Sequence, residues 1–403
     1  MHFPLPANTF PSLIVSEEDR LELQNLSDTF VYSAIKEYTD FYDAKHSVLD
    51  KKRWQLIKTR ENMTAYRAMR LTKTKRDHFA SKERVDSGII TASTKLQRVL
   101  AVGTVEGEFN DMAFGLITGS AEMMMIKSSY TNDMVVDEKV LATVVEPTPI
   151  EPVRGTFLKW SVSCGVPVFL RKLIRPRDFV YLESTGILKV KSERIGYCLV
   201  HSLQIPTIGE LTKYQIVRGN ISVCVLFRQK SFGKIELYVK GFVDPMGSVQ
   251  PCIAVSHTAD ALLSFCKIVH CGQMKKLYWL WTARKTVVLD HDNSDCVVCT
   301  NYPCRPKICE VCMHTICTRC SVTKKLSFLS STTGQVFPRN VIFCVRCLLA
   351  AMKADALQVA AEQIRCQVPT IDLYDVSTRP TSSSKMVSPS SANIPDATRE
   401  FFG

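Results

Sequence analysis

Cysteine gives the strongest chemical signal in this sequence, because eight cysteines form four regular pairs between positions 296 and 347. Two thiolates separated by two residues can bind one metal ion, and four sulfurs complete the tetrahedron that zinc accepts. The pairs are Cys296/Cys299, Cys309/Cys312, Cys317/Cys320 and Cys344/Cys347. The sequence therefore predicts two structural Zn²⁺ ions in closed sites, which leave no open position for a catalytic water.

The spacing of the pairs predicts how they share the two ions. Nine residues separate the first pair from the second, four the second from the third, and twenty-three the third from the fourth. Pairs crowded in this way usually interleave, so the first and third are expected to share one ion and the second and fourth the other. Disulfides or scattered buried thiols are the alternative, but regular pairs in an apparently cytosolic chain favour metal. Cys304 has no place in this scheme and is interpreted as a spare thiol.

The cysteine pattern resembles that of a FYVE-type zinc finger, a module that docks on membranes carrying phosphatidylinositol 3-phosphate. A RING finger also interleaves two zinc ions, but it places a histidine ligand just before its third pair. Here Cys312 already completes a pair, and His314 lies in the gap after it. The FYVE-type resemblance is therefore the better fit.

The segment before the third cysteine of this finger departs from the FYVE-type pattern. The family's lipid-reading motif is a basic run, Arg-Arg/Lys-His-His-Cys-Arg, whereas this sequence reads Arg305-Pro-Lys-Ile-Cys-Glu310. Both histidines are missing, and glutamate replaces the last arginine. Because a phosphate needs converging cationic donors, Arg305 and Lys307 are the candidate headgroup-binding residues. By position, the resemblance implies that Tyr302 and Pro303 form the loop that dips into the bilayer.

Composition and charge limit the classes of protein to consider. The 403 residues leave room for two domains, and 46% hydrophobic residues is ordinary for a globular protein. We expect no secretory signal and no stretch of the roughly 18 apolar residues that a membrane span needs. The net charge of +12 favours an anionic partner. Many basic residues lie between Lys51 and Arg84, where a solvated surface is favoured over a binding face. Nucleic acid is not expected, because no nucleic-acid fold accompanies the charge.

The order of expected elements indicates an α+β fold before the finger. A capped helix is expected from Ser16 to about Val48, with Asp19 at the capping-box position. Strands, a polar connection and a methionine-rich helix follow, and then a long series of strands that alternate apolar and polar residues. A closing helix ends this part. The expected ranges are Trp54–Met69 (one or two strands), Leu71–Gln97 (connection), Arg98–Val105, Asp111–Tyr130 (helix), Val140–Val145, Thr156–Ser163, Asp178–Ser184, Ile187–Val190, Ile195–Leu203, Tyr214–Val217, Ser222–Arg228, Lys234–Val243 and Ala254–Trp281 (helix).

This order resembles the START superfamily, and four motifs resemble those of START-like proteins that carry a C-terminal FYVE-type finger. The motifs are Val102-Gly-Thr-Val-Glu-Gly107, Leu158-Lys-Trp160, Arg177-Asp-Phe-Val-Tyr-Leu-Glu183 and Glu193-Arg-Ile-Gly-Tyr197. The resemblance implies a helix-grip fold, in which a curved antiparallel sheet and a long C-terminal helix enclose an apolar ligand. It also implies a lipid binder and not an enzyme.

Polar residues inside this expected domain are the candidates for a second site. Strand alternation puts Arg177 and Glu183 on one face, where they could pair with each other or bind a lipid headgroup; a structural ion pair is the alternative. His201 and His257 are interpreted as hydrogen-bonded core or rim residues. No nucleophile elbow, P-loop or dinucleotide fingerprint occurs, so no catalytic residue is assigned.

The sequence thus predicts five segments and one function. They are an N-terminal extension (1–15), a START-like domain (16–284), a two-zinc finger (285–350), a terminal helix (351–367) and a disordered tail rich in Pro, Ser and Thr (368–403). We expect a cytoplasmic lipid-binding protein, peripheral on endosomal membranes through an anionic or phosphoinositide surface. The rival functions are a protein-interaction module with a structural finger and a RING-like ubiquitin ligase.

Overall fold

The computed structural model describes residues 3–44, 48–69, 98–164, 175–247, 249–284, 295–330 and 334–366. They fall into two compact units. Unit 1 takes its described residues from 1–275 and 355–370, and unit 2 takes them from 276–354. The predicted connection at 71–97 and the predicted tail at 368–403 lie outside the described residues.

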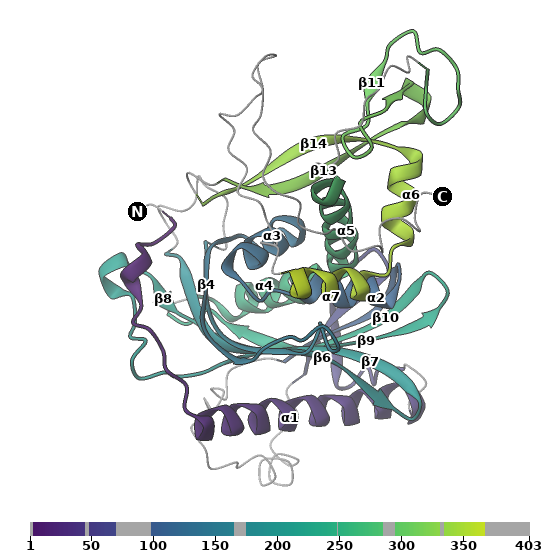
Figure 1. The fold of residues 1–403 in the computed structure, drawn as a ribbon. Helices are drawn as coiled ribbons and strands as arrows, with labels where there is room; N and C mark the ends of the chain where they lie inside the picture. Colours follow the sequence, from purple (N-terminus) through teal and green to yellow (C-terminus); the bar gives the residue numbers. More distant parts are fainter. Residues whose placement is uncertain are drawn as a thin grey trace. The chain divides into compact units, whose positions relative to one another are not determined.

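Unit 1 is built on one sheet of ten strands that is antiparallel except for the short β8, which confirms the predicted α+β class. The sheet curves around the helices on one of its faces (Figure 1). Its strand order is β1-β2-β3-β10-β9-β7-β6-β5-β4, with β8 in parallel beside β6. The strands are β1 Trp54–Arg60, β2 Met63–Ala68, β3 Val99–Glu106, β4 Val135–Val145, β5 Gly155–Ser163, β6 Arg177–Val190, β7 Glu193–Ser202, β8 Val217–Arg218, β9 Asn220–Ser231 and β10 Lys234–Asp244.

Two of the strand predictions were wrong in detail. The segments predicted as separate strands at 178–184 and 187–190 are one strand, β6, because Thr185 and Gly186 stay in register with β7. The strand predicted at Tyr214–Val217 is mostly a 3-10 turn, Thr212–Tyr214 (η6), followed by the short β8.

Helix α1, Glu17–Thr39, covers the outer face of the sheet and ends in a π-helical turn, Asp40–Ala44 (η2) (Figure 1). Its start confirms the predicted capping box, because Ser16 accepts from the Asp19 N–H and Asp19 accepts from the Ser16 N–H. Val31, Ile35 and Tyr38 are buried against outward-facing residues such as Leu226. Apolar residues at helical spacing therefore fix which side of α1 meets the sheet.

The inner face of the sheet carries α2, Phe109–Leu116, α3, Ala121–Thr131, and α4, Pro251–Ser264 (Figure 1). A 3-10 turn, Phe265–Lys267 (η7), joins α4 to α5, Ile268–Arg284. Against expectation, the stretch Pro251–Ala283 is long and apolar enough to pass for a membrane span, with a mean hydropathy of 1.4. Its apolar residues include Ala259 and Leu262, which are buried in the core on the inner face of the sheet.

The single helix predicted for Asp111–Tyr130 is two helices, α2 and α3. The chain leaves the helical conformation at Ile117, and Ser120 then caps α3 by accepting from the Met123 N–H. Serine competes for backbone hydrogen bonds and so favours a cap over a helix interior. The break places Thr118 over the inner face of the sheet, where its hydroxyl contacts Lys159 and Glu183.

Two glycines allow α2 and α5 to pack closely. A Cβ on Gly272 would lie 2.0 Å from the Asp111 carbonyl oxygen, and a Cβ on Gly115 would lie 2.2 Å from that of Ile268. Neither contact can be relieved by turning a side chain, because both partners are backbone atoms. Glycine at these positions therefore sets the distance between the two helices.

Replacing Gly272 by alanine should destabilise unit 1 by about 2–3 kcal/mol, since the helices must separate to admit the methyl group. Thermal unfolding followed by circular dichroism measures this. Gly209→Ala is the matched control, because a Cβ there meets nothing within 4 Å. Equal melting temperatures for the two variants would show that α2 and α5 are not held at this distance.

The described residues of unit 2 form two small hairpins and a helix, in addition to the end of α5 from Lys276 onward. They are β11, Lys307–Ile308, with β12, Thr315–Ile316; β13, Ser321–Leu329, with β14, Val336–Cys344; and α6, Val345–Lys353. The terminal helix predicted at 351–367 falls on two helices, because α6 ends at Lys353 and α7, Ala356–Cys366, follows. Helix α7 belongs to unit 1, where Asp355 accepts a hydrogen bond from Asn110 at 2.9 Å.

Candidate metal and ligand sites

The eight paired cysteines form two tetrads in unit 2. One contains Cys296, Cys299, Cys317 and Cys320, and the other contains Cys309, Cys312, Cys344 and Cys347. In each tetrad the sulfur atoms lie within 4.8 Å of one another. The first pair is therefore grouped with the third and the second with the fourth, as their spacing predicts. Cys304 is exposed and belongs to neither tetrad.

The sulfur geometry fits metal ligation. Cys299 Sγ and Cys317 Sγ are 3.8 Å apart, which excludes a disulfide of about 2.05 Å. Four sulfurs at about 2.3 Å from one zinc ion stand about 3.8 Å apart along the edges of the tetrahedron. In the second tetrad the Cys344 N–H points at Cys309 Sγ at 3.2 Å. This arrangement suits a thiolate held by a metal.

The hairpins bring the cysteines of different pairs together. Ile308 pairs with Thr315 and Lys307 with Ile316, so the strands that lead to Cys309 and Cys317 run side by side. The longer hairpin pairs Ser321 with Cys344. Ser321, which follows Cys320 of the first tetrad, is therefore held opposite Cys344 of the second tetrad. The two sites share one scaffold, and disorder at one site should affect the other.

The residues predicted for lipid contact lie beside the second tetrad. Arg305 is exposed, while Lys307 is half-buried and donates to Ser321 Oγ at 3.3 Å. Glu310, which stands where the family has arginine, accepts from Arg339 at 2.6 Å and from the Ile342 N–H at 3.1 Å. Arg339 thus offsets the charge of the substituted glutamate.

The prediction for the membrane loop needs a correction. Tyr302 is 75% exposed, but Pro303 is buried and cannot enter a bilayer without leaving its packing. Two other apolar residues of this region are exposed instead, Ile308 at 46% and Met313 at 47%. The sequence alone did not show that these two residues are exposed. In the structure, Met313 directly follows Cys312 in the turn after the second cysteine pair, where its φ is 59° and its side chain lies outside the core.

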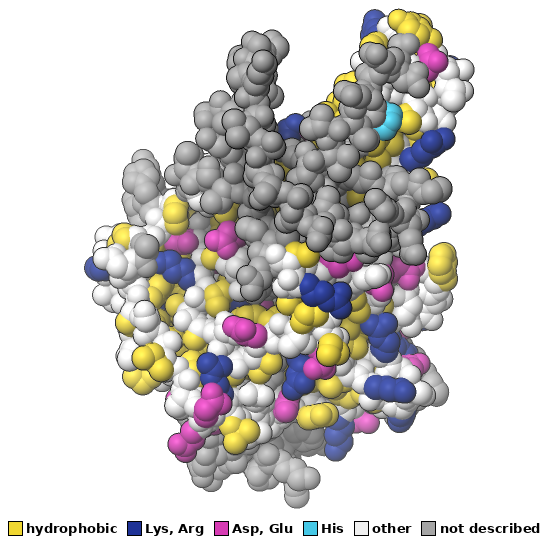
Figure 2. Space-filling model, in the orientation of Figure 1, with side chains coloured by type: hydrophobic (Ala, Val, Ile, Leu, Met, Phe, Trp, Pro, Cys, Tyr) yellow, Lys and Arg dark blue, Asp and Glu magenta, His cyan; other side chains and the backbone are white. Residues whose placement is uncertain are grey.

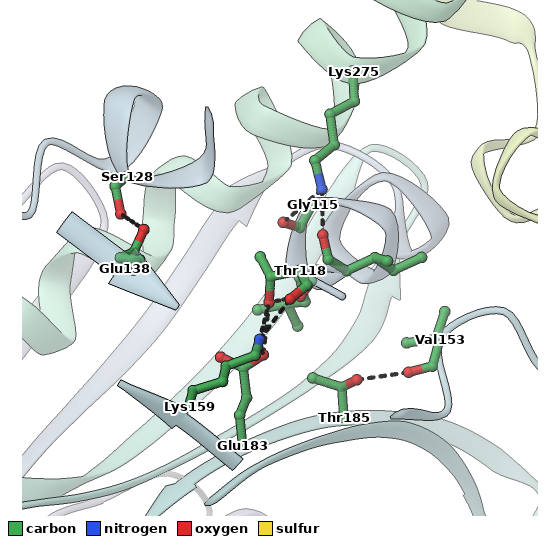
Figure 3. A network of polar contacts seen from close by, with 11 residues as sticks. Gly115, Thr118, Ser128, Glu138, Val153, Lys159, Glu183, Thr185 and Lys275 are labelled. Carbon is green, nitrogen blue, oxygen red and sulfur yellow. Dashed lines mark hydrogen bonds and ion pairs between the residues drawn. The ribbon is translucent and has the colours of Figure 1, made fainter. Parts of the chain in front are cut away.

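The second candidate site is a buried polar cluster on the inner face of the sheet in unit 1 (Figure 3). Lys159 of β5 pairs with Glu183 of β6, and their side chains are 0% and 3% exposed. Thr118, in the break between α2 and α3, donates to Glu183 at 2.6 Å and accepts from Lys159 at 2.8 Å. Burial opposes the ionisation of Glu183, but the ammonium groups of Lys159 and Lys127 keep its pKa below the usual value.

The proposed pairing of Arg177 with Glu183 was wrong. Six residues of extended strand separate them, which is about 20 Å, so they share a face without touching. Arg177 donates to the Pro245 carbonyl at 3.2 Å and to the Arg175 carbonyl. The partner of Glu183 is Lys159, which lies diagonally across β5 and β6, where Tyr181 is directly opposite Lys159. The sequence alone did not indicate this register.

Further ionisable groups surround the pair. Burial raises the pKa of Glu138 to about 8, and Glu138 accepts from Ser128 at 3.1 Å. Burial lowers the pKa of Lys275 to about 8. Lys275 donates to the carbonyls of Phe114 and Ile117 at the end of α2. The Gly115 carbonyl is also within reach of its Nζ, at 3.5 Å (Figure 3). Burial also lowers the pKa of Lys127, but Glu183, Glu138 and Asp133 raise it further, so the net direction is upward.

His201 lies on the opposite face of the sheet, beneath α1. Its Nδ1 contacts Ser222 Oγ at 2.9 Å, its ring is 4.3 Å from that of Phe30, and its Nε2 is buried without a partner. Burial lowers its pKa to about 4. The residue is therefore a neutral core histidine, as the sequence interpretation held.

Stability should fall on acidification because of His201. The unfolded side chain titrates near 6.5, so between pH 6.5 and 4 the unfolded state binds a proton that the folded state resists. The loss reaches at most about 3 kcal/mol at pH 4. Urea unfolding at pH 7 and pH 4.5 should show a smaller acid loss for His201→Gln than for the unchanged chain. Equal losses would contradict this role of His201.

The basic segment that begins at Lys51 is described only up to Met69. Within it, Lys58 and Arg60 both pair with Asp260, at 2.8 and 3.1 Å. Figure 2 shows Lys and Arg side chains interspersed with Asp and Glu on the visible face. The described part therefore favours the solvated surface over a dedicated basic binding face.

Unit 1 therefore has an α+β fold in which helices cover both faces of one curved sheet. The segment with the two cysteine tetrads follows it in the sequence. No protein-family model and no curated protein matches the chain. Among solved structures, human StAR-related lipid transfer protein 5 has a TM-score of 0.42 at 11% identity, covering 62% of this chain and 98% of its own. A STAR-related lipid transfer protein fragment from Xanthomonas axonopodis has 0.35 at 14%, covering 54% and 98%. Lipid transfer is the activity named for those proteins.

Proposed function

We propose that this protein is a non-enzymatic lipid-binding protein, in which unit 1 holds one lipid and the metal-loaded finger docks on a membrane. The observation that carries the proposal is the buried Lys159–Glu183–Thr118 cluster, which lies on the inner face of the sheet beside an apolar core. A buried ion pair gains little stability over apolar residues of the same volume. Its presence beside an apolar core suits an amphipathic ligand, with the polar end at the cluster and the acyl part against the sheet.

The neighbouring strand offers apolar surface for such a ligand. Val200 lies on the inner face of the central strand β7, next to β6, yet it is only half-buried. Ile221 on β9 is also half-buried and packs against the same core. Covering this surface with an acyl chain would contribute about 25 cal/mol per Å².

Lipid exchange between vesicles tests the first half of the proposal. Donor vesicles carry a fluorescent lipid and a quencher, and the expected result is protein-dependent dequenching on addition of acceptor vesicles. Transfer requires unit 1 to take up the fluorescent lipid from a donor vesicle and release it into an acceptor vesicle. The transfer rate should therefore rise with the concentration of the protein. A transfer rate equal to the protein-free rate for neutral, zwitterionic and anionic lipids would count against lipid binding.

The finger supplies the second half of the proposal. Zinc would be bound by the two cysteine tetrads and would stabilise the fold of unit 2. Exposed Tyr302, Ile308 and Met313 would enter the bilayer, and Arg305 and Lys307 would contact anionic headgroups such as phosphatidylinositol 3-phosphate. A single basic side chain near such a surface contributes about 1 kcal/mol, so the apolar contacts must add to it. The proposed site of action is the cytosolic face of endosomes.

Vesicle flotation distinguishes the lipid-selective form of this docking from general charge attraction. Arg305→Ala/Lys307→Ala should abolish a preference for phosphatidylinositol 3-phosphate over plain anionic vesicles. Lys189→Ala/Lys191→Ala, which removes two exposed basic residues of unit 1, is the control of equal charge. If both double variants lose the same amount of vesicle binding, and added salt removes the remaining binding, then general charge attraction explains the docking and the lipid-selective form is contradicted.

A further inference from the structure

Helix α5 carries the boundary between the two units, which falls between Lys275 and Lys276. Lys275 belongs to unit 1 and donates to backbone carbonyls at the end of α2. Lys276 belongs to unit 2, is only 2% exposed, and donates to the carbonyls of Met352 and Ala354 at 2.9 and 3.1 Å. Two consecutive buried ammonium groups therefore hold the ends of two helices, α2 in unit 1 and α6 in unit 2.

The helix whose end Lys276 holds begins inside the second cysteine tetrad. The Cys344 side chain caps α6 by accepting from the Cys347 N–H at 3.3 Å, and both sulfurs belong to that tetrad. A metal ion bound there would fix the first turn of α6. Because α6 has only 9 residues, it needs such support to remain helical. Its two ends are thus held by the tetrad and by Lys276.

Helix α7 follows this point directly and returns the chain to unit 1. The Asp355 carboxylate accepts from the Leu357 N–H at 3.0 Å and from Asn110 of α2 at 2.9 Å. Helix α7 lies against α2, and Leu357 packs on the core of the inner face of the sheet. Ala354, whose carbonyl accepts from Lys276, directly precedes Asp355. The start of α7 therefore has one anchor in each unit.

We propose that metal at the second tetrad keeps α7 packed on α2, so that loss of this metal exposes the inner-face core of unit 1. Without the metal the first turn of α6 is released, and Lys276 loses the ordered carbonyls at the end of that helix. A buried ammonium without acceptors is costly, so this part of α5 becomes less stable and Ala354 is no longer held. Helix α7 has 11 residues, too few to be stable without packing. The finger thereby controls access to the core of unit 1.

Hydrogen–deuterium exchange of the full chain, followed by mass spectrometry, tests this coupling. The zinc-loaded chain is compared with the same chain after a chelator has removed the zinc. We expect exchange in α7 and α2 to become about tenfold faster or more, the effect of breaking hydrogen bonds to a charged group. Helix α1 packs on the opposite face of the sheet, so its exchange should not change. No lipid takes part, so the outcome is independent of the proposed lipid binding.

Lys276→Met separates this coupling from the metal itself. The variant keeps both tetrads, so its zinc content should equal that of the unchanged chain, while exchange in α7 and α2 becomes faster as it does without zinc. Lys353→Met is the matched control, because it removes an exposed lysine at the end of the same helix, α6. It should leave the exchange of α2 unchanged.

Equal exchange in α7 and α2 with and without zinc would overturn the proposal. An increase of the same size in α1 would also overturn it, because the metal would then support the whole chain and not α7 in particular. If Lys276→Met fails to fold, Asn110→Ala removes the other anchor of Asp355 and should speed exchange in α7 at full zinc content. Unchanged exchange in α7 of that variant would contradict the anchoring of α7 at Asp355.

Discussion

Substitution of Cys309 by serine should reduce bound zinc from two ions per chain to one or fewer and unfold much of unit 2. Cys309 belongs to the second tetrad, where its Sγ receives the Cys344 N–H. Serine is a poor zinc ligand, and a structural zinc site contributes about 10–16 kcal/mol in small zinc domains. Elemental analysis by mass spectrometry gives the metal content, and limited proteolysis reports the unfolding.

Cys304→Ser is the matched control for this substitution. It removes a thiol from the same segment, but Cys304 is exposed and outside both tetrads. Its metal content and protease resistance should equal those of the unchanged chain. The pairing of Ser321 with Cys344 joins the scaffolds of the two sites, so Cys309→Ser should also weaken the first site. Two ions retained in Cys309→Ser would refute the tetrad assignment.

Removal of Glu183 alone should destabilise unit 1 by about 3–5 kcal/mol, because Glu183→Ala leaves the Lys159 ammonium buried without its counterion. Lys159 is 0% exposed and cannot reach water. The double substitution Lys159→Met/Glu183→Leu removes both charges and should recover most of the loss, since apolar residues can replace a buried pair at little cost. Thermal unfolding by circular dichroism compares the three chains.

An exposed ion pair provides the comparison for Glu183. Glu193, at the start of β7, pairs with Arg228 at 2.7 Å but is 58% exposed. Surface pairs of this kind contribute about 0–1 kcal/mol, so Glu193→Ala should be nearly silent. A Glu183→Ala chain as stable as Glu193→Ala would mean that Lys159 finds another partner or is neutral, and the buried ion pair would not be a feature of the native state.

Local sequence rules predicted the elements whose cause is local. Ser16 and Asp19 form the capping box because both residues lie within one helical turn. Apolar residues found most strands of the sheet, but several strands are buried on both faces, as in β5, where every residue from Gly155 to Val162 is buried. The cysteine spacing predicted the grouping of the tetrads, because the short gaps between pairs restrict which sulfurs can converge.

Features that depend on register or on distant packing were not accessible from the sequence. Lys159 and Glu183 meet through the diagonal register of β5 on β6, which a lysine between two apolar residues does not reveal. Thr118 joins them only because the helix predicted across it is broken. Lys127 was hidden in a methionine-rich helix whose apolar residues dominated the pattern. Pro303 was placed in a membrane loop by position, and only its burial shows otherwise.

Native mass spectrometry of the full chain, after incubation with mixed-lipid vesicles and removal of the vesicles, tests the central claim most directly. The account predicts a bound species heavier than the zinc-loaded chain by the mass of one lipid, identifiable by fragmentation. The Lys159→Met/Glu183→Leu chain, which keeps the fold but lacks the polar cluster, should carry less of it. A single species at the mass of the chain with its metal ions, across all vesicle compositions, would contradict the account.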